Sequence, residues 1–429
     1  MTIQVIPGTT QRVSAPSLSP NGQPISRLLG RIRRPIPPTQ AAGSTLGDGR
    51  VVVVYEHPAG GVFARIVLPD DTLSLEIDVD PKGLAASVAM GIDGTFAVVY
   101  QRDFVSMGRS ATHILIRTYN PDGSPKYWLP IEPEIATGHF APLLARRSQV
   151  SGPSVAALYD GKFAVIWSHG YRGITISPSF PWLTAVAQSD IRYCIYDPVT
   201  RFKSPDNISL QITSPTRANF SSIAQITELK PFSPGLLAWS THREGTQNTS
   251  LTGSFQSCGT GICSKDGKVI SAADYFTLGT ANMSLPTIVA LGLTPRGTLK
   301  CVVPFNNPSG YYRFGHMDWV QTPRGDVSDL VDISFTVNIG STSLGIGVAV
   351  TALLNGKFVL AQEVPLPNAT FNGGIKGRIC SSAGAEGEEF PIVVEGYRPS
   401  LASTPDGFYA VWMEPDPSDP NLVPAFTEL

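Results

Sequence analysis

The sequence repeats a pattern in which a polar turn is followed by a continuous apolar run. The clearest copy, residues 160–167, has the sequence DGKFAVIW. An Asp-Gly pair favours a tight turn because glycine adopts positive φ at little cost. Branched and aromatic side chains suit a pleated, covered surface. The pattern therefore predicts a tight turn that leads into a buried strand.

Seven copies of this unit occur along the chain. The apolar runs are VVVVY, FAVVY, FAVIW, GLLAW, GTLKCVV, KFVLA and FYAVW. The intervals between the turn glycines range from 45 to 74 residues. The glycines that mark the copies are Gly49, Gly94, Gly161, Gly235, Gly297, Gly356 and Gly407.

The fullest copy contains three further strand-like segments, at residues 153–158, 190–196 and 207–213, with a long polar loop at 168–189. Helical periodicity is absent, and four antiparallel strands per repeat are typical of a β-propeller. A β-sandwich does not require seven copies of one signature, and a β-helix repeats on a shorter period. We predict an all-β fold, a single seven-bladed β-propeller of four-stranded antiparallel blades.

The final copy has too few residues after Trp412 for a complete blade. Two strand-like segments near the N-terminus are free to complete it. We therefore predict that residues 1–43 form a segment that closes the last blade and that residues 44–429 form the propeller. Eight blades is the alternative, if residues 1–43 form more than a patch.

Composition narrows the set of partners. The net charge of −2 and the pI of about 6.3 give no reason to expect nucleic acid, which usually requires a basic stripe. No apolar run reaches the length of about 18 residues that predicts a membrane span. The first residues lack a signal-peptide pattern. We expect a protein or glycan partner, and the compartment and oligomeric state stay open.

Cofactor and metal motifs are also absent from the sequence. The five cysteines lack the CxxC spacing of zinc sites, and no P-loop or GxGxxG motif occurs. We predict no metal, no cofactor and no assigned catalytic residue. The sequence leaves open whether Cys258 and Cys263 form a disulfide.

The repeated unit resembles the degenerate propeller repeats of bacterial secreted and surface proteins. Residues 153–197 carry this similarity, and residues 399–412 carry a shorter version of it. The resemblance implies a propeller fold and a binding role, and it supplies no catalytic residues. The sequence lacks the Ser-x-Asp-x-Gly-x-Thr-Trp box of sialidases and the calcium loops of integrin-type propellers.

Polar side chains follow the second strand of most repeats. In a propeller blade, the loop after the second strand and the loop between blades emerge on the same face, so these residues are expected to form one rim. Loops are exposed to solvent and are therefore rich in polar residues, so polar side chains at strand ends need no ligand to explain them. This is the simplest interpretation. The candidate ligand-binding residues on the rim are His57, Arg102, Asp103, His169, Arg172, Trp182, His242 and Arg243.

Three functions fit this pattern. The first is a non-enzymatic binding or structural propeller that recognises a protein or carbohydrate through loops of one face, because variable loops on a rigid scaffold commonly form binding surfaces. The second is a carbohydrate-active hydrolase or lyase with a site at the axial rim. The third is a subunit of a larger assembly, such as a virion or surface layer.

Overall fold

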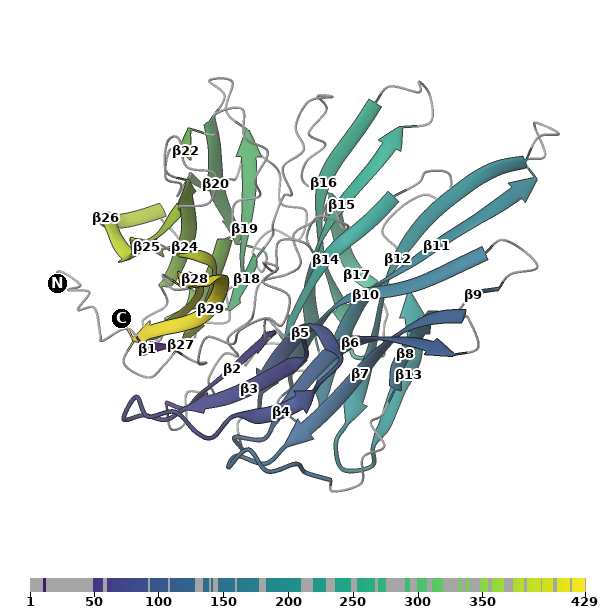
Figure 1. Cartoon of the computed structure of the whole chain (residues 1–429). Coiled ribbons are helices and arrows are strands. Elements are labelled where there is room, and N and C mark those ends of the chain that lie inside the picture. The colour runs from purple at the N-terminus through teal and green to yellow at the C-terminus, as the bar shows by residue number, and fades with distance from the viewer. Residues whose placement is uncertain are drawn as a thin grey trace.

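The computed structural model contains β-strands and no helix among the residues it describes (Figure 1). None of these residues belongs to a helix that could cross a bilayer. The described residues are 11–12, 49–56, 60–91, 93–106, 109–127, 134–138, 140–141, 146–158, 160–176, 183–209, 219–228, 236–247, 253–266, 269–274, 290–293, 299–306, 311–318, 331–332, 337–338, 348–353, 357–365, 373–381, 384–394, 396–403, 407–416 and 419–428.

The first half of the chain contributes three antiparallel sheets. The first sheet contains β2 (Val51–Glu56), β3 (Val62–Val67) and β4 (Ile77–Asp80). The second contains β5 (Gly83–Met90), β6 (Phe96–Ser106), β7 (Arg109–Tyr119) and β8 (Glu134–Gly138). The third contains β9 (Phe140–Ala141), β10 (Arg146–Ala157), β11 (Phe163–Ile176), β12 (Leu183–Asp197) and β13 (Phe202–Ser209).

Four more sheets follow in the described part of the second half. The fourth contains β14 (Asn219–Glu228), β15 (Leu236–Gln247), β16 (Gly253–Ser264) and β17 (Val269–Asp274). The fifth contains β18 (Ala290–Leu293), β19 (Leu299–Asn306), β20 (Tyr311–Asp318), β21 (Val331–Asp332) and β22 (Val337–Asn338). The sixth contains β23 (Val348–Ala352), β24 (Phe358–Pro365), β25 (Gly373–Ser381) and β26 (Gly384–Val393). The last contains β27 (Tyr397–Ser403), β28 (Phe408–Asp416), β29 (Asp419–Glu428) and β1 (Gln11–Arg12).

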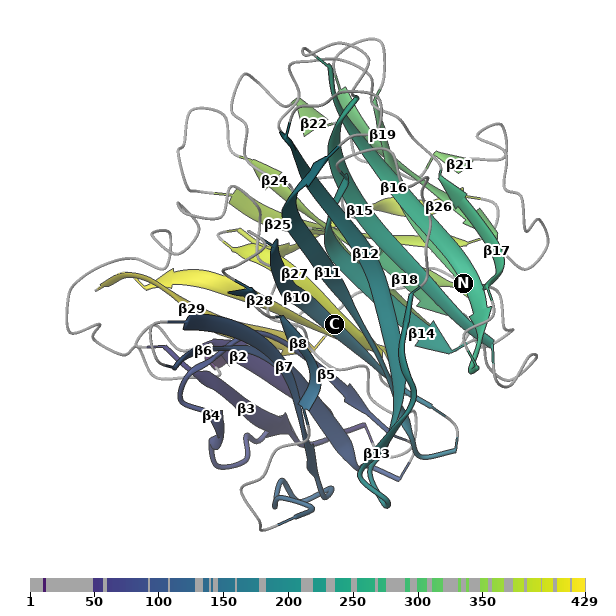
Figure 2. The same cartoon turned by 90° about the vertical axis from the view of Figure 1, so that its right-hand side faces the viewer.

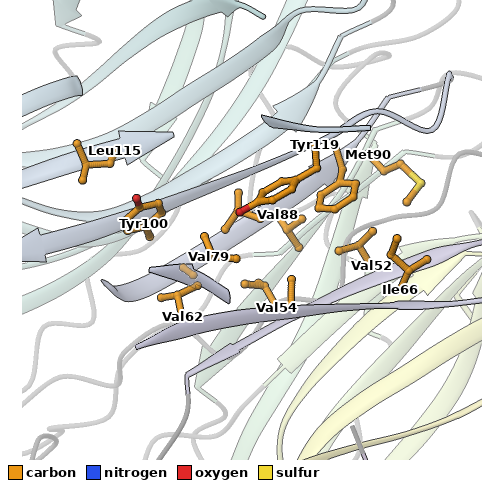
Figure 3. Close-up of a cluster of buried hydrophobic side chains, with 14 residues drawn as sticks. Val52, Val54, Val62, Ile66, Val79, Val88, Met90, Tyr100, Leu115 and Tyr119 are labelled. Carbon is orange, nitrogen blue, oxygen red and sulfur yellow. The ribbon is translucent and has the colours of Figure 1, made fainter. Parts of the chain in front are cut away.

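Neighbouring sheets pack against each other in chain order. Two of the buried clusters show why the strands carry continuous apolar runs. In β6, Phe96, Val98 and Tyr100 pack against the first sheet (Figure 3), whereas Ala97 and Val99 pack against the third. Successive side chains of a strand point to opposite faces, so a strand covered on both faces must be apolar at every position.

The same alternation joins the last sheet to the first. Val51, Val53 and Tyr55 of β2 share a buried cluster with Tyr409 and Val411 of β28. Figure 2 shows the yellow strands of the last sheet beside the purple strands of the first. Segments from the two ends of the chain are therefore packed together.

A repeated hydrogen bond accompanies this packing. In each case a side chain from a strand or from a loop beside a strand of one sheet donates to a backbone carbonyl in the turn between the third- and fourth-strand positions of the next sheet. The described bonds of this kind are Arg50 Nη1 to Pro121 O at 2.9 Å, Tyr127 Oη to Pro198 O, and Tyr193 Oη to Lys265 O at 2.6 Å.

The seam between the last and first sheets has a related contact. The Tyr409 hydroxyl donates to the Asp71 carboxylate, which lies in the turn before the outer strand of the first sheet. The donor again comes from one sheet and the acceptor from the corresponding turn of its neighbour. The contact between the last and first sheets therefore uses the turn between the third- and fourth-strand positions, as the other described bonds do.

The structure describes two residues of the N-terminal segment. Gln11 and Arg12 pair antiparallel with Phe426 and Ala425, at the outer edge of the last sheet. That residues 1–43 complete the last blade stays a prediction, and so does the division at residue 43.

One predicted loop is wrong. The segment 168–189 was expected to be a long polar loop, but β11 continues to Ile176 and β12 begins at Leu183. The paired register runs from Phe163↔Tyr196 to Ile176↔Leu183. The polar residues do not interrupt the strand because cross-strand hydrogen bonds satisfy the backbone whatever the side chains are.

The Asp-Gly turns are confirmed at two described positions. Gly94 and Gly161 both have a φ of 79°, and each donates its N–H to a carbonyl three residues earlier. This left-handed conformation strains residues with a Cβ. An added Cβ at Gly94 would lie 3.1 Å from Pro121 Cβ, whereas an added Cβ at Gly161 would meet nothing within 4 Å.

This difference gives a test of the turn assignment. Gly161→Ala should cost about 1 kcal/mol through backbone strain alone. Gly94→Ala should cost more, because the same strain is joined by the contact with Pro121. The urea unfolding midpoints of the two variants measure the effect. If both midpoints equal that of the unaltered protein, the assignment of left-handed turns is wrong.

Candidate functional site

The second sheet extends beyond the first at one end. β6 and β7 contain 11 residues each, whereas β2 and β3 contain 6. Tyr100 is the last β6 residue in the cluster between these sheets, so the remainder of β6 continues past it. We call the residues gathered where the shorter sheet ends the step site, which comprises Glu56, Asp80, Arg102, Phe104 and His113.

Strand register brings three positions of the second sheet into one row. Gly83 of β5 pairs with Arg102 of β6, and Arg102 pairs with His113 of β7. Arg102 and Phe104 share the strand face of Tyr100, which is the face toward the first sheet. Gly83 leaves room in this row, because an added Cβ would lie 3.0 Å from the Tyr100 ring and 3.2 Å from Asp80 Cβ.

An ion pair connects the two sheets at the step site. Arg102 Nη1 lies 3.0 Å from Asp80 Oδ2, and the Asp80 side chain is 1% exposed. The N–H of Lys82 donates to Asp80 Oδ1 at 2.7 Å. Buried carboxylates require such partners, since an unpaired charge out of water is costly. The Arg102 side chain is thereby fixed in position.

An aromatic side chain lies beside this ion pair. The Arg102 guanidinium carbon is 4.7 Å from the centre of the Phe104 ring, and Phe104 meets His113 edge-on with ring centres 4.4 Å apart. Phe104 is nevertheless 37% exposed. The site thus presents part of an aromatic ring held between a cation and an imidazole.

Backbone strain occurs at the base of the same site. Ala85 has a φ of 49°, at an irregularity in the pairing of β5 with β6. Its N–H donates to Glu56 Oε1 at 2.6 Å, which ties the strained residue to the end of β2. Strained non-glycine residues persist where surrounding contacts hold them, and they are frequent at functional sites.

The predicted rim residues are distributed as follows. Arg102 belongs to the step site. Its neighbour Asp103 is exposed on the opposite strand face and accepts a hydrogen bond from Gln101 Nε2 at 3.4 Å. His57 and Trp182 lie outside the described residues.

The other predicted rim residues lie in two different sheets. His169 pairs with Val150 and Asp190 in the third sheet. The remaining positions are Arg172, which pairs with Arg147 and Ala187, His242, which pairs with Ile223 and Cys258, and Arg243, which pairs with Ser221 and Ser257. Their ligand-binding role stays a prediction.

The strand assignment bears on whether Cys258 and Cys263 form a disulfide. Both lie in β16, five residues apart on a single strand. At about 3.3 Å per residue their Cα atoms are roughly 16 Å apart, whereas a disulfide requires less than about 7 Å. Among the described residues, no group of three or more His, Cys, Asp or Glu side chains is arranged to hold a metal ion.

Sequence reasoning placed Glu56 and Arg102 on the rim but missed the other three members of the step site, Asp80, Phe104 and His113. Phe104 and His113 lie in the outer parts of β6 and β7. In the sequence nothing distinguishes these two residues from other strand residues. Asp80 ends the last strand of the first sheet, 22 residues before its partner. A signal was present in the two-residue spacing of Arg102 and Phe104, which places both side chains on one strand face.

Comparisons with known proteins identify no family. No protein-family model matches the chain, and a search of curated proteins finds no match. Solved structures do match. The polysaccharide lyase Uly1 has a TM-score of 0.50 and 9% identity, over 92% of this chain and 91% of that chain.

Two further similar structures have lower scores. The α-L-arabinofuranosidase Arb93A from Fusarium graminearum has a TM-score of 0.48 and 12% identity, over 81% of this chain and 94% of that chain. A Trypanosoma rangeli sialidase has a TM-score of 0.41 and 10% identity, over 84% of this chain and 56% of that chain.

Together with the succession of packed antiparallel sheets, the similarity to Uly1 shows a propeller-type fold. At 9% identity it shows the fold and nothing of the activity. What the step site can do must therefore come from its own chemistry. It combines a fixed guanidinium, a part-exposed aromatic ring and an imidazole, which suits recognition of a ligand with both apolar and hydroxyl-rich surfaces.

The ion pair makes a stability prediction. Arg102→Ala should destabilise the protein by about 3 kcal/mol, because it leaves the buried Asp80 carboxylate without its cation. Arg378→Ala is the matched control, since Arg378 also lies 3.0 Å from a carboxylate but its partner Glu389 is 30% exposed. That control should cost about 1 kcal/mol or less. Equal shifts of the urea midpoint would contradict a structural role for Asp80 and Arg102.

Proposed function

We propose that the protein is a carbohydrate-active propeller whose step site contacts the sugar chain. The observation that supports this most directly is the part-exposed Phe104 ring held between Arg102 and His113. An aromatic ring offers an apolar surface for the C–H face of a sugar ring. The neighbouring guanidinium and imidazole supply hydrogen-bonding groups for hydroxyls.

Two carbohydrate-related functions were considered, a binding propeller and a hydrolase or lyase. The sequence favoured a non-enzymatic binding or structural propeller over a hydrolase or lyase. The similar structure with the highest TM-score among those described here, Uly1, is a polysaccharide lyase. We propose a carbohydrate-active hydrolase or lyase as the first candidate and a non-catalytic carbohydrate-binding propeller as the second, and a turnover assay decides between them. The role of a subunit in a larger assembly stays a prediction.

Turnover separates the two hypotheses. The purified chain is incubated with a panel of neutral, uronate-containing and sialylated polysaccharides, and new reducing ends and unsaturated uronates are measured. Loss of a side chain that touches the transition state commonly lowers the rate about a hundredfold. We expect His113→Ala to lower the rate of polysaccharide cleavage by about this factor. Arg378→Ala, in the sixth sheet, is the control and should keep full activity.

Binding without cleavage in this panel would favour the second candidate. That outcome requires retention on at least one polysaccharide, reduced by Phe104→Ala, with no new chain ends. Neither retention nor cleavage on any member of the panel would overturn the proposed function.

We also propose that the seven sheets close into one ring of seven blades. The support is the buried cluster shared by β2 and β28 and the bond from Tyr409 to Asp71, which reaches the same turn as the bonds between other neighbouring sheets but ends on a carboxylate. In this arrangement β1 supplies the outermost strand of the last blade.

A double-mutant cycle tests the closure. Tyr409→Phe removes the donor of the seam bond and Asp71→Ala removes its acceptor. If the two sheets are packed together, the coupling energy between these substitutions should be about 1 kcal/mol, because the bond joins a hydroxyl to a carboxylate. Additive effects on the free energy of unfolding would mean that the two ends of the chain are not joined.

A further inference from the structure

The charged side chains of the step site carry no excess of positive charge. The site contains two carboxylates, Glu56 and Asp80, and one guanidinium, Arg102. Lys82 contributes only its backbone N–H, to Asp80. Asp80 is buried against Arg102 at 3.0 Å, so the guanidinium already has a full counter-charge in contact with it. The exposed carboxylate of Asp103 is on the opposite strand face. The described charges therefore leave no surplus positive charge for an anion.

The neutralisation of Arg102 by Asp80 changes which ligands Arg102 can bind. An anion that approaches an ion pair is attracted by the guanidinium and repelled by the carboxylate behind it, so the two Coulomb terms largely cancel. The N–H groups of the guanidinium still donate hydrogen bonds, because donation does not require net charge. A neutral hydroxyl loses nothing by this compensation.

We infer that the step site takes a neutral sugar ring and discriminates against sugars that carry a carboxylate, such as uronates and sialic acids. This inference rests on the proposed function and names its substrate class. The apolar face of a neutral ring lies on the exposed part of Phe104, and its hydroxyls accept hydrogen bonds from Arg102. Asp80 is a positioning residue that sets this preference through Arg102.

The experiment compares two ligands that differ in one group. An oligogalacturonate and its carboxyl-reduced, neutral counterpart share the same backbone, and their dissociation constants are measured by calorimetry. Binding is measured at about pH 8, above the range in which imidazoles titrate. The unaltered protein should bind the neutral oligosaccharide at least roughly tenfold more tightly than the acidic one. The carboxylate of the acidic ligand loses water on binding, and Arg102 offers it little attraction in return because Asp80 already neutralises the guanidinium.

A variant tests the cause of the preference. Asp80→Asn keeps the shape of the side chain but removes the counter-charge of Arg102. The ratio of acidic to neutral affinity should rise roughly three- to tenfold, the size expected of an uncompensated charge at a part-exposed site. Asp122→Asn is the matched control. It removes the same charge from the exposed turn after β7, at the other end of the second sheet, and should leave the ratio unchanged.

Failure of this inference can be distinguished from failure of the proposed function. Equal or tighter binding of the acidic oligosaccharide by the unaltered protein would overturn the inference while leaving a carbohydrate function intact. An unchanged ratio in folded Asp80→Asn would remove Asp80 as the cause. If that variant does not fold, the comparison of the two ligands with the unaltered protein still decides the inference. Failure of both ligands, together with the whole polysaccharide panel, would overturn the proposed function itself.

Discussion

The packing of strands that are covered on both faces is the constraint on which this protein depends. Phe96 and Val98 contact one neighbouring sheet, and Ala97 and Val99 contact the other. Each large apolar side chain buried in this way contributes roughly 1.5–3 kcal/mol. A sheet in the array cannot keep its core without both neighbours. For this reason the seam between the last and first sheets matters as much as any contact within a sheet.

The step site follows from unequal strand lengths in this array. A strand needs apolar residues at every position only where both of its faces are covered. Beyond Tyr100 the face of β6 toward the first sheet is no longer part of their common core, and it carries Arg102 and the part-exposed Phe104. Asp80 and Arg102 then fill the junction with an ion pair in place of apolar contacts. The chemistry of the site is thus a consequence of where one sheet stops.

Local sequence was most informative where the backbone conformation is set locally. The left-handed turns at Gly94 and Gly161 and the strands after them agree with the predictions from Asp-Gly pairs and apolar runs. Prediction was poorest at 168–189, where polar residues suggested a loop. A hairpin is stabilised by backbone bonds between its strands, and side-chain polarity gives little information about that pairing.

The sequence by itself determined that the apolar runs form strands, where the turns at Gly94 and Gly161 lie and that the units repeat, because these properties depend on residues close together in the chain. Only the tertiary structure decided that Arg102 pairs with Asp80, that Phe104 and His113 lie beside it, and that Tyr409 reaches Asp71, 338 residues away. The reason is physical. Such contacts depend on how separate sheets are placed against one another, and the alternation of side chains along one strand carries no information about the length or register of its neighbour.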